Sequence, residues 1–180
     1  SRRHEVIRVG RTQGDEQVDI TSQASVQALF EKIGPVDAIV SASGGLYFGP
    51  LATMKDSDFN QGLQDKLLGQ VRLALTGQHY LNEGGSITLI SGIVAHEPIA
   101  QGVNATTVNA ALEGFVRAAA CELPRGIRIN LISPTVLTES VDTYDGFFPG
   151  FESVPAATVA QAYRRSVEGV QTGRVYKVGY

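Results

Sequence analysis

The stretch VDAIVSASGG, residues 36–45, decides the fold class of this chain. Its first half, Val36–Val40, is a short apolar run typical of a strand that is buried on both faces, and its second half is a turn of small residues. Two similar runs follow, SITLIS at Ser86–Ser91 and IRINLIS at Ile127–Ser133. Strands that are apolar on both faces belong to parallel sheets covered by helices, so the sequence predicts an α/β protein.

Segments with helical periodicity lie between and beside these strands. The predicted helices are Ser25–Ile33, a long helix from Asp56 or Ser57 to Tyr80 or Leu81, Asn104–Leu123 and Pro155–Val170. Further strands are predicted at Glu5–Val9, ending at Gly10, and at Arg174–Val178. Right-handed crossovers then give a doubly wound, Rossmann-like parallel sheet. Because the sequence shows no linker, we expect a single domain over residues 1–180.

Composition limits the classes of function. Apolar residues make up 43% of the 180 residues and the net charge is −3, with no run of Lys and Arg that would indicate nucleic-acid or anionic-membrane binding. The single cysteine, Cys121, excludes an intrachain disulfide and is expected to be buried in a reducing compartment. No signal-peptide pattern, bilayer-length apolar run or metal-ligand spacing is found, so we expect a cytoplasmic protein without a metal.

Several short motifs occur in a characteristic order along the chain. They are Gly10-Arg11-Thr12, Asp19-Ile20, Ser41-Ala42-Ser43-Gly44 and Pro134-Thr135-Val136-Leu137-Thr138. Together they resemble the short-chain dehydrogenase/reductase family over nearly the whole chain. The resemblance implies a dinucleotide site formed by Arg11, Thr12, Asp19, Ile20, Ser43, Gly44, Pro134 and Thr138.

The position of Arg11 bears on the choice of cofactor. In the family, the residue after this strand lies beside the adenosine ribose, and a guanidinium there can bind the 2′-phosphate of NADP(H) in a bidentate manner. An acidic residue is usual where NAD is preferred. The resemblance therefore implies NADP(H), while an ordinary exposed arginine is the alternative.

The catalytic residues of the family are replaced in this chain. The family uses a Ser, a Tyr-x-x-x-Lys motif and an Asn on the preceding long helix. Here Ala105 stands at the Tyr position and Asn109 at the Lys position, while Ser91 or Gly92 stands at the Ser position. Lys66, in Lys66-Leu67-Leu68-Gly69, stands where the family has Asn. Asn and Lys have thus exchanged helices, and we take Lys66, Ser91 and Asn109 as the catalytic candidates.

Lys66 is also singled out by its position in the helical pattern. It follows Leu63 by three residues and Phe59 by seven, which places it on the buried face of the helix. A buried lysine needs a partner or a ligand, although a lysine that reaches out from the edge of the apolar stripe is the alternative.

Other groups could supply a proton in place of the missing tyrosine. They are water held by Ser91 or Thr106, the imidazole of His96, and the hydroxyl of Tyr144 in the segment Glu139–Val154. That segment follows a strand at the ligand-binding edge of the sheet, so it is either a substrate lid or a disordered crossover.

The resemblance implies an NADP(H)-dependent oxidoreductase that acts on a small carbonyl or alcohol. A catalytically inactive nucleotide-binding sensor or interaction protein is the alternative, and Ala105 favours it. In the family the two long helices usually form dimers, and these helices are alanine-rich enough to pack closely, so the resemblance implies a homodimer or homotetramer. The family's Gly-rich phosphate loop has no counterpart in the sequence. We therefore expect the natural protein to carry one further βα unit before residue 1, since this unit holds the central strand.

Overall fold

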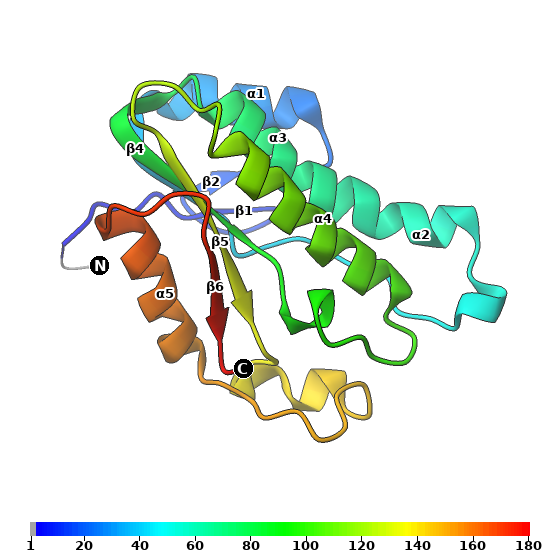
Figure 1. Ribbon diagram of the computed structural model, residues 1–180. Helices are drawn as coiled ribbons and strands as arrows, with labels where there is room; N and C mark the ends of the chain where they lie inside the picture. Colours follow the sequence, from blue (N-terminus) through cyan, green and yellow to red (C-terminus); the bar gives the residue numbers. More distant parts are fainter. Residues whose placement is uncertain (1–2) are drawn as a thin grey trace.

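A four-stranded parallel sheet with the strand order β3-β4-β5-β6 lies at the centre of the structure (Figure 1). The structure, a computed structural model, describes residues 3–180. The strands are β3 (Val36–Val40), β4 (Leu81–Ile90), β5 (Arg128–Pro134) and β6 (Val175–Val178). Sequential parallel strands joined by helices are the α/β arrangement that the apolar runs predicted.

Helices cover both faces of this sheet. They are α1 (Gln23–Ile33), α2 (Asp56–Gly62), α3 (Leu68–Gly77), α4 (Val103–Ala119) and α5 (Ala156–Glu168). Leu131 of β5 packs in the larger core with α1, α3 and α4, whereas its neighbour Ile132 packs with Val159 of α5. Since successive side chains of a strand point to opposite faces, α5 covers one face and α3 and α4 cover the other.

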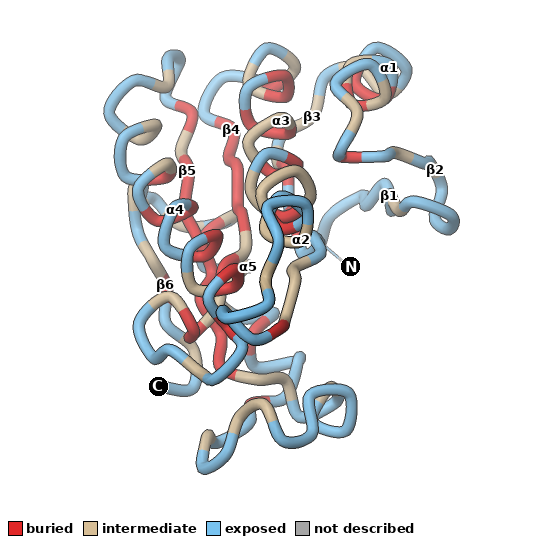
Figure 2. Tube along the Cα trace, turned by 90° about the vertical axis from the view of Figure 1, so that its right-hand side faces the viewer, coloured by how far each residue is buried: buried red, intermediate tan, exposed pale blue. Residues whose placement is uncertain are grey.

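The sheet is not continuous across the described residues. Strands β1 (Val9–Gly10) and β2 (Glu16–Gln17) form a separate two-stranded parallel sheet, beside the outer edge of β3 (Figure 2). The strand predicted at Glu5–Val9 is therefore only two residues long, since its backbone lacks a partner along most of its length. Val40 of β3 is 52% exposed and Val6 is 54% exposed, although both are apolar.

The long helix predicted from Asp56 or Ser57 to Tyr80 or Leu81 is wrong as one continuous α-helix. A π-helical segment, Leu63–Leu67, separates α2 from α3. A π turn contains an extra residue, so the helix face beyond it rotates by about 100°. Leu75, which lies beyond this segment, is exposed, and Leu73 and Ala74 are buried.

Two smaller expectations also need comment. Cys121 is exposed, contrary to prediction, because it follows the end of α4 in a turn at the surface. The segment Glu139–Val154 contains two short 3₁₀ turns, Thr138–Ser140 and Asp142–Tyr144, and its end is tied back by a β-bridge between Leu137 and Val154. The segment thus has a described conformation, although most of its residues are exposed, and its role as a substrate lid stays a prediction.

Candidate functional site

Lys66 lies at the carboxyl end of the sheet, on the π-helical segment, with its side chain turned into the protein. The residue is 9% exposed, and its Nζ donates a hydrogen bond to the carbonyl oxygen of Ser91 at 3.2 Å. Burial removes the ammonium from water and lowers the pKa of Lys66 to about 8. The buried position that the helical pattern predicted is correct, and a proton can leave or return near neutral pH.

The backbone around Lys66 explains how a charged residue is held inside. Gly44 has φ +128°, and a Cβ there would lie 2.6 Å from the Cα of Lys66. The turn after β3 therefore needs glycine at Gly44 to approach the helix this closely.

Gln70 fixes the same helix to the sheet. Its side-chain nitrogen donates to the carbonyls of Lys66 (3.1 Å) and Ile90 (2.8 Å), and its side-chain oxygen accepts from the Ile90 amide (2.9 Å). The sequence analysis missed Gln70. An amide side chain four residues after Lys66 on a buried face was the available signal.

Ser91 and Gly92, which follow β4, connect Lys66 to Asn109. The Ser91 carbonyl accepts from Lys66, and a Cβ on Gly92 would lie 3.7 Å from Nδ2 of Asn109. The Ser91 hydroxyl donates to the Ile132 carbonyl at 3.4 Å. The three catalytic candidates therefore lie around one turn at the end of β4.

Two buried polar atoms at this edge of the sheet have no hydrogen-bond partner in the described part of the chain. They are Oδ1 of Asn109, a residue that is 1% exposed, and Oγ of Ser41 at the end of β3. Buried polar atoms in native proteins are nearly always paired, so these two mark a place where a polar ligand or water fits. The Tyr163 hydroxyl of α5 donates to the Ser41 carbonyl at 2.7 Å, and burial raises the pKa of Tyr163.

Two of the alternative proton donors, Thr106 and His96, have polar partners of their own. The Thr106 hydroxyl donates to the Val94 carbonyl at 2.7 Å. Nε2 of His96 lies 2.5 Å from a carboxylate oxygen of Glu113, a buried residue of α4. The ring of Tyr144 packs against other aromatic rings. Lys66 is the candidate donor whose ammonium bonds to Ser91, next to Gly92, which faces Asn109.

Ala105, at the position of the family's tyrosine, is fully buried in an apolar cluster. Ile93 and Val94 share this cluster, and Phe148 and Phe151 of the lid segment pack against it. The ring of Phe148 contacts that of Phe151 at 5.4 Å between centroids. The aromatic side chains of the segment Glu139–Val154 therefore form an apolar cluster with the residues that follow Ser91 and Gly92.

The residues that the resemblance assigns to the adenosine end lie at the ends of β1 and β2. Arg11 is exposed, and its guanidinium lies 3.7 Å from the carboxylate of Asp65. The Thr12 carbonyl accepts from the Gln17 side chain at 3.3 Å. Oδ1 of Asp19 accepts from the amide and hydroxyl of Thr21, which lowers the pKa of Asp19.

The remaining predicted cofactor residues fall into two groups. Ile20 is buried against Gly69 of α3, where a Cβ would lie 2.6 Å from Cδ1 of Ile20. Ser43, Gly44 and Thr138 are exposed at the carboxyl edge of the sheet, and Pro134 is buried at the end of β5. Thr138 donates from its hydroxyl to Ser153 at 3.1 Å. These last four residues lie at or beyond the carboxyl ends of β3 and β5, on either side of β4, at the edge where open α/β sheets bind ligands.

Other classes of site were also sought in residues 3–180. Within that range no three His, Cys, Asp or Glu side chains are grouped so that they could hold a metal ion. None of the helices in that range has the length and apolar character needed to cross a membrane.

Comparison with known proteins identifies the family. A family model described as Enoyl-(Acyl carrier protein) reductase matches residues 4–172. Hydroxynaphthalene reductase arp2 of Aspergillus fumigatus is 29% identical over 131 residues, which cover 70% of this chain and 48% of that protein. Short-chain reductase protein NovJ of Streptomyces niveus is 33% identical over 140 residues, which cover 74% and 53%. The chain thus spans about half the length of these curated relatives.

Solved structures share the fold as well. The protein lin1944 from Listeria innocua is 48% identical with a TM-score of 0.95, and the match covers 96% of this chain and 86% of that chain. A small-chain dehydrogenase solved in complex with NADPH is 28% identical with a TM-score of 0.80, covering 89% and 80%. With a family model matching most of its length, the chain belongs to the short-chain dehydrogenase/reductase family.

Proposed function

We propose that this protein is an NADP(H)-dependent oxidoreductase that transfers hydride between nicotinamide and a small carbonyl or alcohol, with Lys66 as the proton donor and acceptor. The carrying observation is the buried Lys66 ammonium, whose one hydrogen bond to a described residue runs to Ser91. Lys66 lies where the family has Asn, whereas the family's own proton donor is replaced by the buried Ala105.

The chemistry needs one proton for each hydride. When bound, nicotinamide supplies or accepts the hydride at the substrate carbon. In the reducing direction, the ammonium of Lys66 gives its proton to the carbonyl oxygen, and the neutral amine takes a proton back from solvent. A pKa near 8 suits this role, because both protonation states are accessible near pH 7. The unpaired Oδ1 of Asn109 is an acceptor for a ribose or substrate hydroxyl.

Residues at several places along the carboxyl edge of the sheet and near β1 support the binding of NADP(H). The unpaired polar atoms of Asn109 and Ser41 lie at the carboxyl end of the sheet, where the nicotinamide half would bind. Arg11 is exposed and its guanidinium lies 3.7 Å from the carboxylate of Asp65, so it can turn to the 2′-phosphate. Thr12, Asp19 and Ile20 would frame the adenosine, and Ser43, Gly44, Pro134 and Thr138 would line the remainder. A relative solved with NADPH supports this choice.

The open edge of β3 supports a second part of the proposal. Within residues 3–180, β1 and β3 do not pair with each other. Val6, which precedes β1, and Val40 of β3 are exposed. A further parallel strand between them would cover both and would bring the Gly-rich phosphate loop to the cofactor. We propose that the active protein contains this βα unit. We also propose that it is a cytoplasmic homodimer or homotetramer in which the long helices of one copy pack against those of another.

A nucleotide-binding sensor or interaction protein without catalysis is the second candidate, and the observation that favours it is Ala105. One experiment separates the two. NADPH oxidation is followed with a panel of small aldehydes and ketones for the intact protein and for Lys66→Met, with the exposed Lys55→Met as the matched control. We expect Lys66→Met to lower kcat by about 10²–10⁴-fold and Lys55→Met to leave it unchanged.

Calorimetric titration with NADPH and NADH completes the test. Binding of NADPH in preference to NADH supports the role of Arg11. Binding of NADPH without turnover of any carbonyl would favour the sensor, and binding of neither would refute the nucleotide site altogether.

A further inference from the structure

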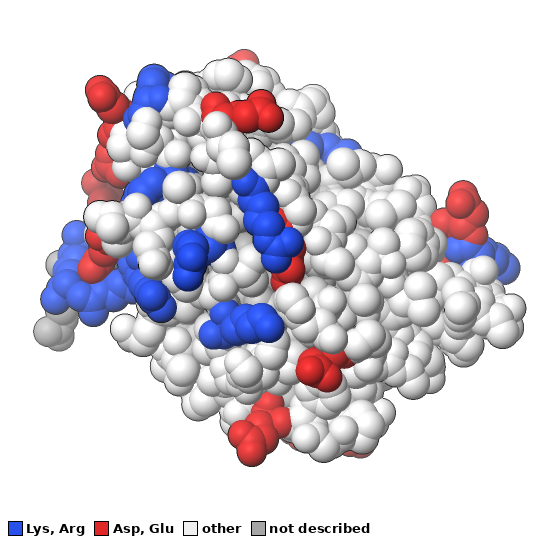
Figure 3. Space-filling model, in the orientation of Figure 1, with Lys and Arg blue, Asp and Glu red and all other residues white. Residues whose placement is uncertain are grey.

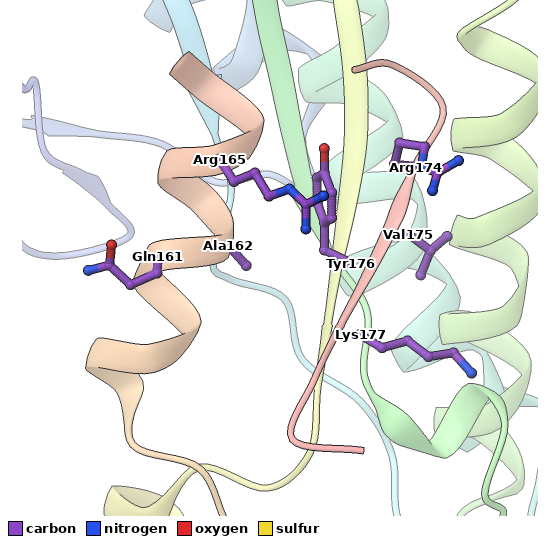
Figure 4. Close-up of a pocket in the computed structure, with 7 residues that line it drawn as sticks. All are labelled: Gln161, Ala162, Arg165, Arg174, Val175, Tyr176 and Lys177. Atoms are coloured by element: carbon purple, nitrogen blue, oxygen red, sulfur yellow. The ribbon is translucent and has the colours of Figure 1, made fainter. Parts of the chain in front are cut away.

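A groove of about 410 Å³ lies beside β6 and α5, away from Lys66. Its lining includes Arg165, Tyr176 and Lys177 (Figure 4), and Figure 3 shows Lys and Arg side chains over the same face. Within residues 3–180, none of the lining residues forms a hydrogen bond with residues 44–67, the segment that carries Lys66. On the other side of the sheet, α4 lies against α2 and the π segment (Figure 1).

Asn104, in the first turn of α4, is a polar side chain buried where three segments meet. It is fully buried, next to Ala105. Its Oδ1 accepts from the Tyr47 amide at 3.0 Å, and its Nδ2 donates to the Phe59 carbonyl at 2.7 Å. Tyr47 belongs to the segment after β3 and Phe59 belongs to α2. Because a buried amide cannot turn without losing both bonds, Asn104 fixes these two segments relative to α4.

The bond to Phe59 lies where the helix changes its hydrogen-bond pattern. In a regular α-helix the Leu63 amide would donate to the Phe59 carbonyl, four residues back. Here the Leu63 amide donates to the Asn60 carbonyl, and the π segment begins at Leu63. Asn104 therefore supplies a donor to the carbonyl whose usual helical partner bonds elsewhere.

Gly62 leaves the space that the Asn104 amide occupies. Its φ of −67° is one that any residue adopts, so the backbone conformation does not require glycine. A Cβ at this position would overlap with Oδ1 of Asn104. The close approach of Asn104 is therefore the reason that a side chain is excluded at Gly62.

The two segments that Asn104 holds lie on either side of Lys66. Tyr47 follows Gly44, whose backbone approaches the Cα of Lys66, and a Cβ on Gly45 would lie 2.8 Å from Oδ2 of Asp65. Phe59 precedes Lys66 by about two helical turns. A rotation of α2 or a shift of this turn would therefore move the Lys66 ammonium away from the carbonyl to which it donates.

We propose that Asn104 is a positioning residue for Lys66. Its amide fixes the start of the π segment and the segment after β3, and it thereby holds the Lys66 ammonium inside the protein beside Ser91. The inference deepens the proposed function, on which its effect on turnover rests. Asn104 bonds to none of the predicted cofactor residues, so it acts on the reaction through Lys66.

The first test follows the titration of Lys66 without cofactor or substrate. Urea unfolding of the intact protein is measured in half-unit steps from about pH 7 to 10.5 for the natural protein, for Asn104→Leu and for the matched control Asn82→Leu. Asn82 is exposed at the start of β4, at the opposite end of the sheet. Burial lowers the pKa of Lys66, so the urea midpoint of the natural protein should rise with pH across this range.

Asn104→Leu should reduce that rise. A lysine that is no longer held inside regains water, and its pKa returns towards the ordinary value for lysine. We expect Asn104→Leu to keep less than about half of the rise and Asn82→Leu to keep all of it. A purely structural role of Asn104 would lower the urea midpoint by the same amount at every pH and leave the rise unchanged.

Gly62→Ala perturbs the same contact from the other side, and it keeps the test valid if Asn104→Leu does not fold. Alanine favours a helix over glycine, so without the Asn104 contact this variant should raise the urea midpoint at every pH. Overlap of the new Cβ with Oδ1 should instead displace the Asn104 amide. We therefore expect Gly62→Ala to reduce the pH-dependent rise as Asn104→Leu does.

Turnover gives the second readout. Asn104→Leu should lower kcat for NADPH oxidation by about tenfold and leave the KM for NADPH within about twofold, because it displaces the proton donor and not the nucleotide. Asn82→Leu should leave both constants unchanged. A fall in kcat with a full pH-dependent rise would show that Asn104 acts other than through Lys66, and this result would refute the proposal.

Two outcomes of the urea titrations would also overturn the proposal. One is the absence of any rise in the natural protein, and the other is a full rise in Asn104→Leu or, if that variant does not fold, in Gly62→Ala. If the natural protein binds no nucleotide and reduces no carbonyl, the proposed function fails, yet the urea titrations still decide whether Asn104 holds Lys66. If Lys66→Met abolishes turnover while Asn104→Leu leaves the rise and kcat unchanged, only the role of Asn104 fails.

Discussion

Replacing Lys66 with Met should change the pH dependence of stability. Burial lowers the pKa of Lys66 from 10.5 to about 8 in the folded protein. The unfolded chain therefore binds more protons between these values, and the stability of the natural protein should rise with pH across this window. Lowering the pKa by this amount corresponds to about 3 kcal/mol in the free energy of unfolding. The natural protein is therefore destabilised by this full amount below about pH 8, and the destabilisation has disappeared by about pH 10.5.

Lys66→Met has no titrating group at this position, so it should lack that rise. At pH 7 the variant gains about 3 kcal/mol from removal of the buried charge. The variant is also destabilised by about 1–3 kcal/mol, because the Ser91 carbonyl loses its hydrogen-bond donor. The difference between the pH profiles is the cleaner quantity, since the unpaired carbonyl affects all pH values alike.

The assay is urea denaturation followed by circular dichroism at half-unit steps from about pH 7 to 10.5. The exposed Lys55→Met serves as the control and should give a profile parallel to that of the natural protein. If the natural protein and Lys66→Met have parallel profiles, the ammonium is not desolvated in the folded state. The basis for its role as a proton donor would then be lost.

Three further predictions concern single contacts. Gly44→Ala should destabilise the protein by about 1–3 kcal/mol in urea titrations, because Ala is strained at φ +128° and its Cβ would lie 2.6 Å from the Lys66 backbone; stability equal to the natural protein would contradict the tight approach. Gln70→Leu should destabilise it by about 2 kcal/mol, since the Ile90 amide and carbonyl lose their partner, and unchanged amide exchange at Ile90 would argue against this. Arg11→Ala should weaken calorimetric binding of NADPH about tenfold and leave NADH unaffected, and an equal loss for both would exclude a 2′-phosphate contact.

The sequence determined the fold class and predicted that three candidate site residues lie near one another. The apolar runs at Val36–Val40 and Ser86–Ser91 can be buried on both faces only in a covered parallel sheet, so periodicity alone predicted the central strands. Helical spacing placed Lys66 inside, and the order of the motifs placed Ser91 and Asn109 beside it. These inferences succeed because they depend on local pattern and on chain order.

Only the tertiary structure decided how that site is held and which groups are left unpaired. The π segment Leu63–Leu67 interrupts the helix where Lys66 lies against Gly44, which follows β3, and Gln70 of α3 bonds to Ile90 at the end of β4. These contacts join segments that are distant in sequence, so the local pattern does not reveal them. The orphaned Oδ1 of Asn109 reflects what surrounds it in space and not its neighbours in the chain. The same holds for Asn104, since the segments that it joins meet only after folding.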